Sequence, residues 1–101
     1  MSQATGSITG TKSALTGSFT DKDSGKVGIF SIASNGSTEF TVSAATMVYT
    51  PGPPVQRSYS CTIGSTSFAF TVDNGDTISG DLDRPITTKI PHIGTISWPI
   101  F

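Results

Sequence analysis

Residues 67–82 read SFAFTVDNGDTISGDL, and this stretch decides the fold. Phe68, Phe70 and Val72 alternate with polar or small residues, which places them on one face of an extended strand. Asn74-Gly75 follows, and this dipeptide favours a β-hairpin turn because both central residues of such a turn need positive φ. Beyond the turn, Ile78 and Leu82 bracket Gly80 in a second extended run. The stretch therefore predicts a pair of antiparallel strands.

The same alternation recurs along the whole chain. No apolar residues recur at helical spacing over ten residues without a Gly, a Pro or a run of Thr. A second Asn-Gly pair, at Asn35-Gly36, and the DKDSG stretch at 21–25 predict further turns. The pattern predicts an all-β protein, an antiparallel β-sandwich or small barrel of about eight short strands. We expect these strands near residues 6–12, 14–20, 26–33, 37–49, 57–64, 66–73, 76–82 and 93–100.

Composition restricts the function classes. The 101 residues predict a single β-sandwich domain over 1–101. Only 13% of residues are charged and the net charge is −1, so the chain lacks the basic stripe of a nucleic-acid-binding protein. No apolar run approaches the length of a membrane span. Fifteen serines and sixteen threonines predict outer strand faces covered with hydroxyl groups.

The long run at 37–49 has two interpretations. In the first, a regular strand turns Phe40, Val42, Ala44 and Val48 inward, and Met47 and Tyr49 outward. In the second, a β-bulge at Ala44-Ala45 turns Met47 and Tyr49 inward. The sequence leaves both open.

The residues that could act in catalysis lack the neighbouring residues that a catalytic site needs. Asp23-Ser24-Gly25 superficially resembles the motif of retroviral-type aspartic proteases, but it sits in a charged turn and not at the end of the buried apolar strand that such a carboxylate pair requires. The single histidine, His92, has no carboxylate within eight residues and reads as a partly exposed loop residue. The single cysteine, Cys61, reads as a small buried hydrophobe. We expect no enzymatic activity and no cofactor.

Four aspartates, Asp73, Asp76, Asp81 and Asp83, fall within eleven residues. Clustered carboxylates suit calcium, which prefers several oxygen ligands. Short acidic side chains also belong in tight turns, where they accept hydrogen bonds from their own backbone. The expectation is turn carboxylates and no metal, although the sequence does not settle whether these residues bind calcium.

Tyr49 and Tyr59 flank the proline-rich connection 50–57, and with Arg57 they carry the main functional prediction. Tyrosine rings on a rigid loop can stack on the apolar face of a sugar while Arg57 and hydroxyls bind its polar groups. The residues predict a soluble, non-enzymatic, lectin-like binding module with a glycan as ligand. The alternative for both tyrosines is that they brace a hairpin.

The apolar run at the end of the sequence carries the alternative function. Ile96, Trp98 and Ile100 share one strand face, and Phe101 follows them. Such a surface is rarely left in water, so residues 94–101 should form a strand packed into the sheet or into a subunit interface. The protein is then a homo-oligomer through Trp98, Ile100 and Phe101, and in the alternative function a self-assembling virion, tail or fibre subunit.

Residues 1–6, MSQATG, contain neither the charged region nor the apolar region of a secretory signal. We therefore expect a cytoplasmic protein, or one released by a non-classical route.

Overall fold

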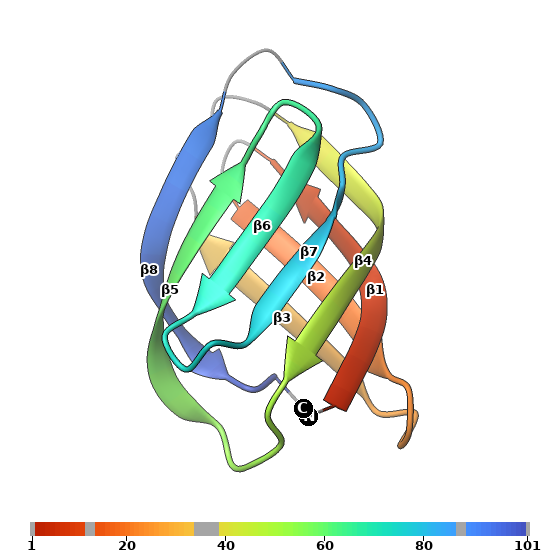
Figure 1. The fold of residues 1–101 in the computed structure, drawn as a ribbon, viewed down its shortest axis with the longest axis vertical. Helices are drawn as coiled ribbons and strands as arrows, with labels where there is room; N and C mark the ends of the chain where they lie inside the picture. Colours follow the sequence, from red (N-terminus) through yellow and green to blue (C-terminus); the bar gives the residue numbers. More distant parts are fainter. Residues whose placement is uncertain (1, 12–13, 34–38, 87–88, 101) are drawn as a thin grey trace.

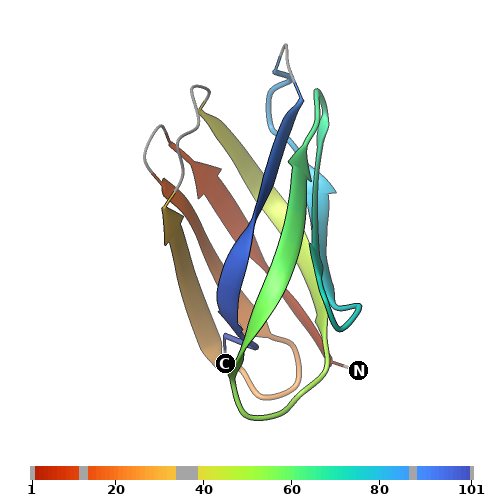
Figure 2. The same ribbon diagram turned by 90° about the vertical axis from the view of Figure 1, so that its left-hand side faces the viewer.

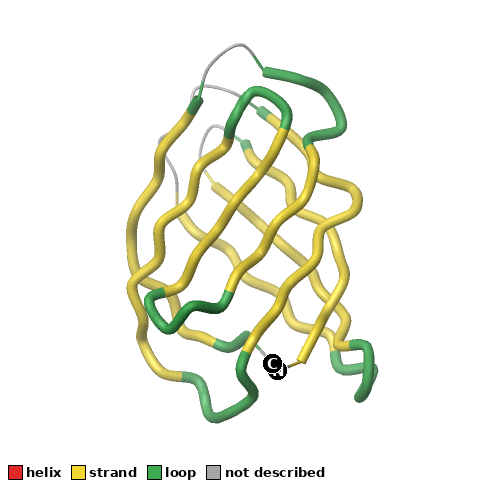
Figure 3. The backbone as a smooth tube through the Cα atoms, viewed as in Figure 1, coloured by secondary structure: helices red, strands yellow, loops and turns green. Residues whose placement is uncertain are grey.

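The computed structural model describes residues 2–11, 14–33, 39–86 and 89–100. Within these ranges the chain forms strands joined by loops and turns, without a helix (Figure 3). The eight strands are β1 (Ser2–Gly10), β2 (Ala14–Asp21), β3 (Val27–Ala33), β4 (Phe40–Tyr49), β5 (Val55–Ile63), β6 (Ser67–Val72), β7 (Thr77–Asp81) and β8 (Ile90–Trp98). The all-β prediction is confirmed.

All eight strands join one antiparallel sheet in the order β3-β2-β1-β4-β7-β6-β5-β8. The sheet curls over, so that β5, β6 and β7 lie in front of β2 and β3 (Figure 1). Seen from the side, the two groups form opposing layers (Figure 2). The curl leaves β3 and β8 as the two edge strands of the sheet.

The core lies between these layers and follows the period-two pattern of the sequence. Inward positions carry the buried side chains, and outward positions of the same strands are mostly Ser and Thr. Phe70 lies near the centre of the aromatic cluster: its ring centroid is 4.7 Å from that of Tyr59 and 6.1 Å from that of Trp98. Alternation thus places the apolar residues in the core and the hydroxyl groups in water.

A β-bulge interrupts β4. Gly6 of β1 pairs with Ala45, whereas Ile8 pairs with Val42, so β4 contains one residue more than the facing part of β1. Ala44 is exposed and Ala45 is buried as a result. Of the two interpretations of this strand, the bulge is confirmed. It turns the side chains that follow it, Met47 and Tyr49, into the core.

Several inward positions are glycines that face aromatic rings. Gly17 pairs with Phe30 and Gly10 pairs with Phe40, and a Cβ atom at either glycine would overlap the ring. Gly94 pairs with Tyr59, whose hydroxyl lies 2.9 Å from where a Cβ would be. The rings lie against the bare backbone of these glycines and fill the core where no side chain projects.

A turn forms at Asn74-Gly75 as predicted, but only Gly75 of the two has positive φ, so it is not the type in which both central residues have positive φ. Gly75 has φ of 95°, and its N–H donates to the Val72 carbonyl at 2.9 Å. The turn predicted at Asn35-Gly36 lies outside the described residues.

The apolar run at residues 94–101 belongs largely to β8, which pairs with β5. Trp98 is completely buried in the chain's own core, and Ile100 packs against that core. Phe101 lies outside the described residues. The prediction of a packed strand is confirmed for Trp98, and its burial within the chain makes a subunit interface unnecessary to explain it.

Candidate functional site

The structure does not bring Tyr49, Arg57 and Tyr59 together as an exposed sugar-binding lip. Tyr49 is 5% exposed and Tyr59 is 4% exposed. The bulge in β4 turns Tyr49 inward, and Tyr59 shares the inward face of β5 with Cys61, where its ring stacks on Phe70. Buried rings cannot stack on a sugar, so the prediction of a sugar-binding lip requires correction: the two tyrosines are core residues.

Arg57 lies half-buried on β5 and forms a salt bridge with Asp73, with Nη1 at 3.2 Å from Oδ1. The other carboxylate oxygen of Asp73 accepts a hydrogen bond from the Ser58 N–H at 3.1 Å. This contact fastens the turn after β6 to β5. Exposed ion pairs contribute little free energy, so its role is mainly positional.

Asp76 is the most enclosed carboxylate of the predicted acidic cluster, with 0% exposure. One oxygen accepts from the Thr50 N–H (2.9 Å), the Asn74 amide (3.0 Å) and the Trp98 indole Nε1–H (2.9 Å). The other accepts from the Thr50 hydroxyl at 3.1 Å. Burial raises the pKa of this carboxyl, but the hydrogen bonds outweigh it and the pKa is lowered overall.

Asp21 is a second buried carboxylate, at the end of β2. The Tyr49 hydroxyl donates to one oxygen, and the N–H groups of Asp23 and Ser24 donate to the other at 2.9 Å. The Tyr49 hydrogen bond is the main cause that lowers the pKa of Asp21 to about 2. Burial and the nearby carboxylate raise the pKa of Tyr49 to about 12. Asp21 therefore holds a turn and a core tyrosine in place.

Asp83 holds the loop after β7 against β4. Its carboxylate accepts from the N–H and hydroxyl of Ser43, at 3.0 and 2.8 Å, and from the Thr41 hydroxyl at 3.2 Å. The backbone hydrogen bond from Ser43 is the main cause that lowers the pKa of Asp83. Among the described residues, no group of three or more His, Cys, Asp or Glu side chains is placed to hold a metal ion.

His92 is a strand residue, and its prediction as a loop residue is wrong. It pairs with Cys61 across β8 and β5, and its ring lies 5.7 Å from that of Tyr59. Its Nε2 atom is buried, with no hydrogen-bond partner in the described part of the chain. Burial raises the pKa of the Cys61 thiol to about 12, so this neighbour is a protonated thiol and a poor nucleophile. Side chains alternate between the two faces of a strand, and Trp98 follows His92 by six residues, an even number. The inward position of Trp98 therefore predicts that His92 also points inward.

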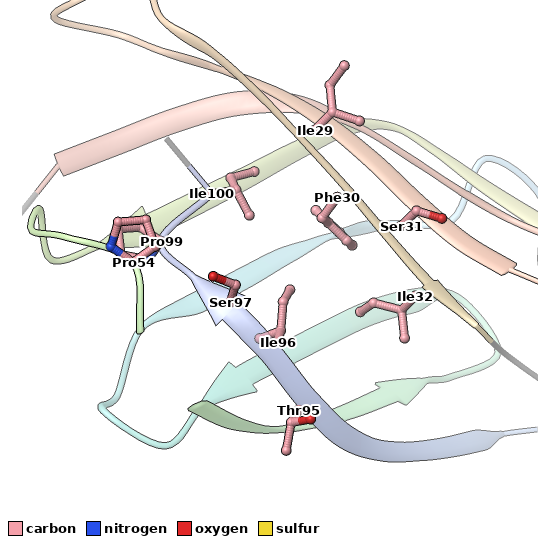
Figure 4. Close-up of a pocket in the computed structure, with 10 residues that line it drawn as sticks. All are labelled: Ile29, Phe30, Ser31, Ile32, Pro54, Thr95, Ile96, Ser97, Pro99 and Ile100. Carbon is pink, nitrogen blue, oxygen red and sulfur yellow. The ribbon is translucent and has the colours of Figure 1, made fainter. Parts of the chain in front are cut away.

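The most distinctive surface is the seam between the two edge strands. A groove of about 510 Å³ separates β3 from β8, and no pairing joins these strands among the described residues. Ile32 of β3 and Ile96 of β8 point into the groove, and Ile29 points away from it (Figure 4). None of the described residues that line the groove is charged.

Large apolar side chains are exposed on the strands that border this seam. Val27 and Ile29 of β3 are 62% and 72% exposed, and Ile93 of β8 is 77% exposed. The β3 sequence VGIFSIA contains no charge and no proline. An unpaired edge strand usually carries a charged residue or a proline, because its free N–H and carbonyl groups can otherwise pair with strands of other chains. Sequence reasoning identified this strand but had no signal that it would lie at an edge.

A different surface lies on the outer face of β1, β2 and β4. A shallow hollow of about 540 Å³ forms beside the bulge. Six hydroxyl side chains and no charged residue line it: Thr5, Ser7, Ser18, Thr20, Ser43 and Thr46.

Comparisons of the chain with protein-family models, with curated proteins and with solved structures gave no match. No helix long and apolar enough to cross a membrane occurs in the described part of the chain.

Proposed function

We propose that the protein is a non-enzymatic structural subunit that assembles with copies of itself through the seam between β3 and β8. One observation carries the proposal: an edge strand without charge or proline exposes Val27 and Ile29 beside an uncharged groove. Exposed apolar surface on an unpaired edge favours strand addition by another chain. The apolar C-terminal run, which first suggested assembly, contributes Ile96 and Ile100 to the groove lining.

The state of the reactive groups supports the non-enzymatic part of the proposal. Asp21, Asp76 and Asp83 are occupied by structural hydrogen bonds. The Cys61 thiol is buried and its pKa is raised to about 12. The three carboxylates, held by hydrogen bonds, and the buried thiol therefore serve the stability of the fold. A cytoplasmic location, or non-classical release, remains a prediction of the sequence.

Analytical ultracentrifugation over a wide protein concentration range tests assembly. We expect the sedimentation coefficient of the native chain to rise with concentration. Ile29→Lys should abolish this rise, because a charge on the exposed edge opposes strand pairing. Thr71→Lys is the matched control, since Thr71 is exposed on β6 in the middle of the sheet. A native chain that stays monomeric at every concentration contradicts the proposal.

Carbohydrate binding is the second candidate, and the hydroxyl-lined hollow on β1, β2 and β4 now supports it in place of the tyrosines. Hydroxyl groups can exchange hydrogen bonds with a sugar, although this surface offers no aromatic ring for stacking. A glycan array tests it. Ser18→Val should remove the signal while circular dichroism shows an unchanged melting temperature. Absence of any glycan signal for the native chain at high concentration contradicts this candidate.

A further inference from the structure

We infer that two copies of the chain pair edge to edge through β3, antiparallel about a twofold axis that passes beside Ile29, so that Ile29 faces Ile29 of the second copy. This inference rests on the proposed function and specifies its partner, its strand and its register. It makes the first assembly a closed dimer, because a twofold contact uses the same surface on both copies.

The hydrogen-bonding pattern of the sheet shows which main-chain groups of β3 are free. The Asp21 N–H donates to the Lys26 carbonyl at 2.8 Å, and β2 and β3 continue this pairing in antiparallel register. Hydrogen-bonded pairs alternate along an antiparallel ladder. The groups of Gly28, Phe30 and Ile32 therefore face β2, and those of Val27, Ile29 and Ser31 face the free edge. A strand that pairs with β3 must bind these last three residues.

The same three residues carry the outward side chains of β3, and two of them are the exposed apolar ones. Pairing Ile29 with its copy places Val27 opposite Ser31 on each side of the axis. Each exposed isoleucine then covers the other, and each valine is flanked by the partner strand. Cross-strand apolar pairs are the contacts that stabilise a sheet. A shift of two residues in one direction sets Ile29 against Ser31 and leaves both isoleucines without a direct apolar partner. A shift in the other direction sets Ile29 against Val27, but Ser31 then faces Gly25 in the turn before β3 and has no partner within the strand.

The second copy fits β3 better than a charged partner would. In this twofold contact a charge at position 29 would face its own copy, so a strand that pairs with itself avoids charge there, and β3 has none. The other edge is less suitable, since Pro91 of β8 has no N–H to donate. The groove between β3 and β8, about 510 Å³, separates the two edges, and β8 of the same chain does not pair with β3 among the described residues.

The contact is small. A seven-residue edge belongs to the low end of protein interfaces, below about 1,200 Å² of buried surface, where association is weak and depends on concentration. We therefore expect a reversible dimer.

Disulfide trapping tests the register. In a Cys61→Ala background, Ile29→Cys places two thiols at a hydrogen-bonded pair whose Cα atoms are about 5.5 Å apart, within the range of a disulfide. Mild oxidation should convert this variant to a covalent dimer, seen on a non-reducing gel. Ser31→Cys is the matched control on the same exposed face. Its two copies would lie four residues apart, about 13 Å along the strand, so it should remain uncrosslinked.

A mixture of two cysteine variants tests a pairing that the inferred register requires. Val27→Cys and Ser31→Cys chains of different length should form the mixed covalent dimer, because these positions face each other across the axis. Two results would overturn the inferred register. One is a covalent dimer of Ser31→Cys with itself. The other is a mixed dimer of Ile29→Cys with Ser31→Cys that forms in preference to the dimer of Ile29→Cys with itself.

The outcomes separate the two proposals. If ultracentrifugation shows association but Ile29→Cys does not crosslink, the inferred Ile29–Ile29 register is wrong, while assembly through the seam stands. If the native chain is monomeric at every concentration, the proposed function itself fails.

Discussion

Asp76 is a residue at which distant parts of the chain meet. Its carboxylate binds Thr50 after β4, Asn74 in the β6–β7 turn and Trp98 at the end of β8. A buried carboxylate is costly unless hydrogen bonds compensate it, and here four donors do so. The spacing of aspartates in the sequence suggested a turn or a calcium ligand. It could not show that Trp98, twenty-two residues later, donates to the same group.

A double-mutant cycle measures this contact. Asp76→Asn replaces one acceptor oxygen by an NH₂ group and should lower the free energy of unfolding by about 2–4 kcal/mol. Trp98→Phe removes the indole donor and keeps most of the ring. The coupling energy between the two changes should be about 1.5–3 kcal/mol, the range of a hydrogen bond to a charged group. Chemical denaturation followed by circular dichroism gives each value. Strict additivity would show that the indole hydrogen bond contributes nothing.

Asp21 predicts how stability depends on acid. Its pKa is lowered from 3.8 to about 2 in the folded state, so its ionised form stabilises the fold fully above pH 3.8. This contribution is lost as the pH falls from there through about 2. Asp21→Asn should therefore be less stable than the native chain at pH 7, and the difference should vanish towards pH 2. The urea midpoint measured across this range checks it.

Asp23→Asn is the control for this experiment, because Asp23 is an exposed acid in the same turn. It should follow the native acid profile. If Asp21→Asn instead lowers the urea midpoint by the same amount at every pH, the ionised hydrogen bond to Tyr49 is not the cause.

β4 shows at the scale of an element what sequence patterns can and cannot provide. The run of alternating residues located the strand, and the bulge was one of two interpretations. The choice between them depends on pairing with β1, where Gly6 meets Ala45 and Ile8 meets Val42. That partner is thirty or more residues away in the chain, so local alternation could not decide it. The inward turn of Tyr49 depends on the same choice. Tyr59 is buried for a separate reason, because it shares the inward face of β5 with Cys61.

The bulge makes a sharp prediction. Deleting Ala44 removes the extra residue, and every side chain after it in β4 moves to the opposite face. Met47 and Tyr49 would leave the core, so the deletion should abolish cooperative unfolding. Ala44→Ser keeps the length and an exposed position, and should change the free energy of unfolding by less than about 0.5 kcal/mol. Thermal denaturation followed by circular dichroism compares the two. A deletion variant that melts like the native chain would mean that β4 tolerates a shifted register.

At the scale of the whole molecule, one sheet encloses one core. Strands from both ends of the described chain contribute to it, from Ala4 of β1 to Trp98 of β8. The single domain over residues 1–101 stays a prediction, and this shared core supplies its test. Scanning calorimetry should give one transition whose calorimetric and van't Hoff enthalpies agree. Two resolved transitions would divide the chain into separate units.

Much of the architecture could be predicted because period-two alternation and turn residues act locally. Strand number, the Asn74-Gly75 turn and the burial of Trp98 followed from such signals. The order of strands could not be predicted, since β1 pairs with β4 and β5 with β8 across long loops. That order decides which strand lies at an edge. The candidate site, the β3 edge, therefore depends on the part of the fold that local patterns do not contain.

Trp98 is the only tryptophan of the chain, and it is sealed in the core beside Phe70 and Asp76. Its indole is therefore a built-in optical reporter with a single emitting site. The emission should move to longer wavelength when the core opens to water. Ile29, by contrast, lies on the outer face of β3, so separation of paired subunits should leave the emission unchanged. Tryptophan fluorescence can then distinguish dissociation of paired subunits from unfolding of the chain.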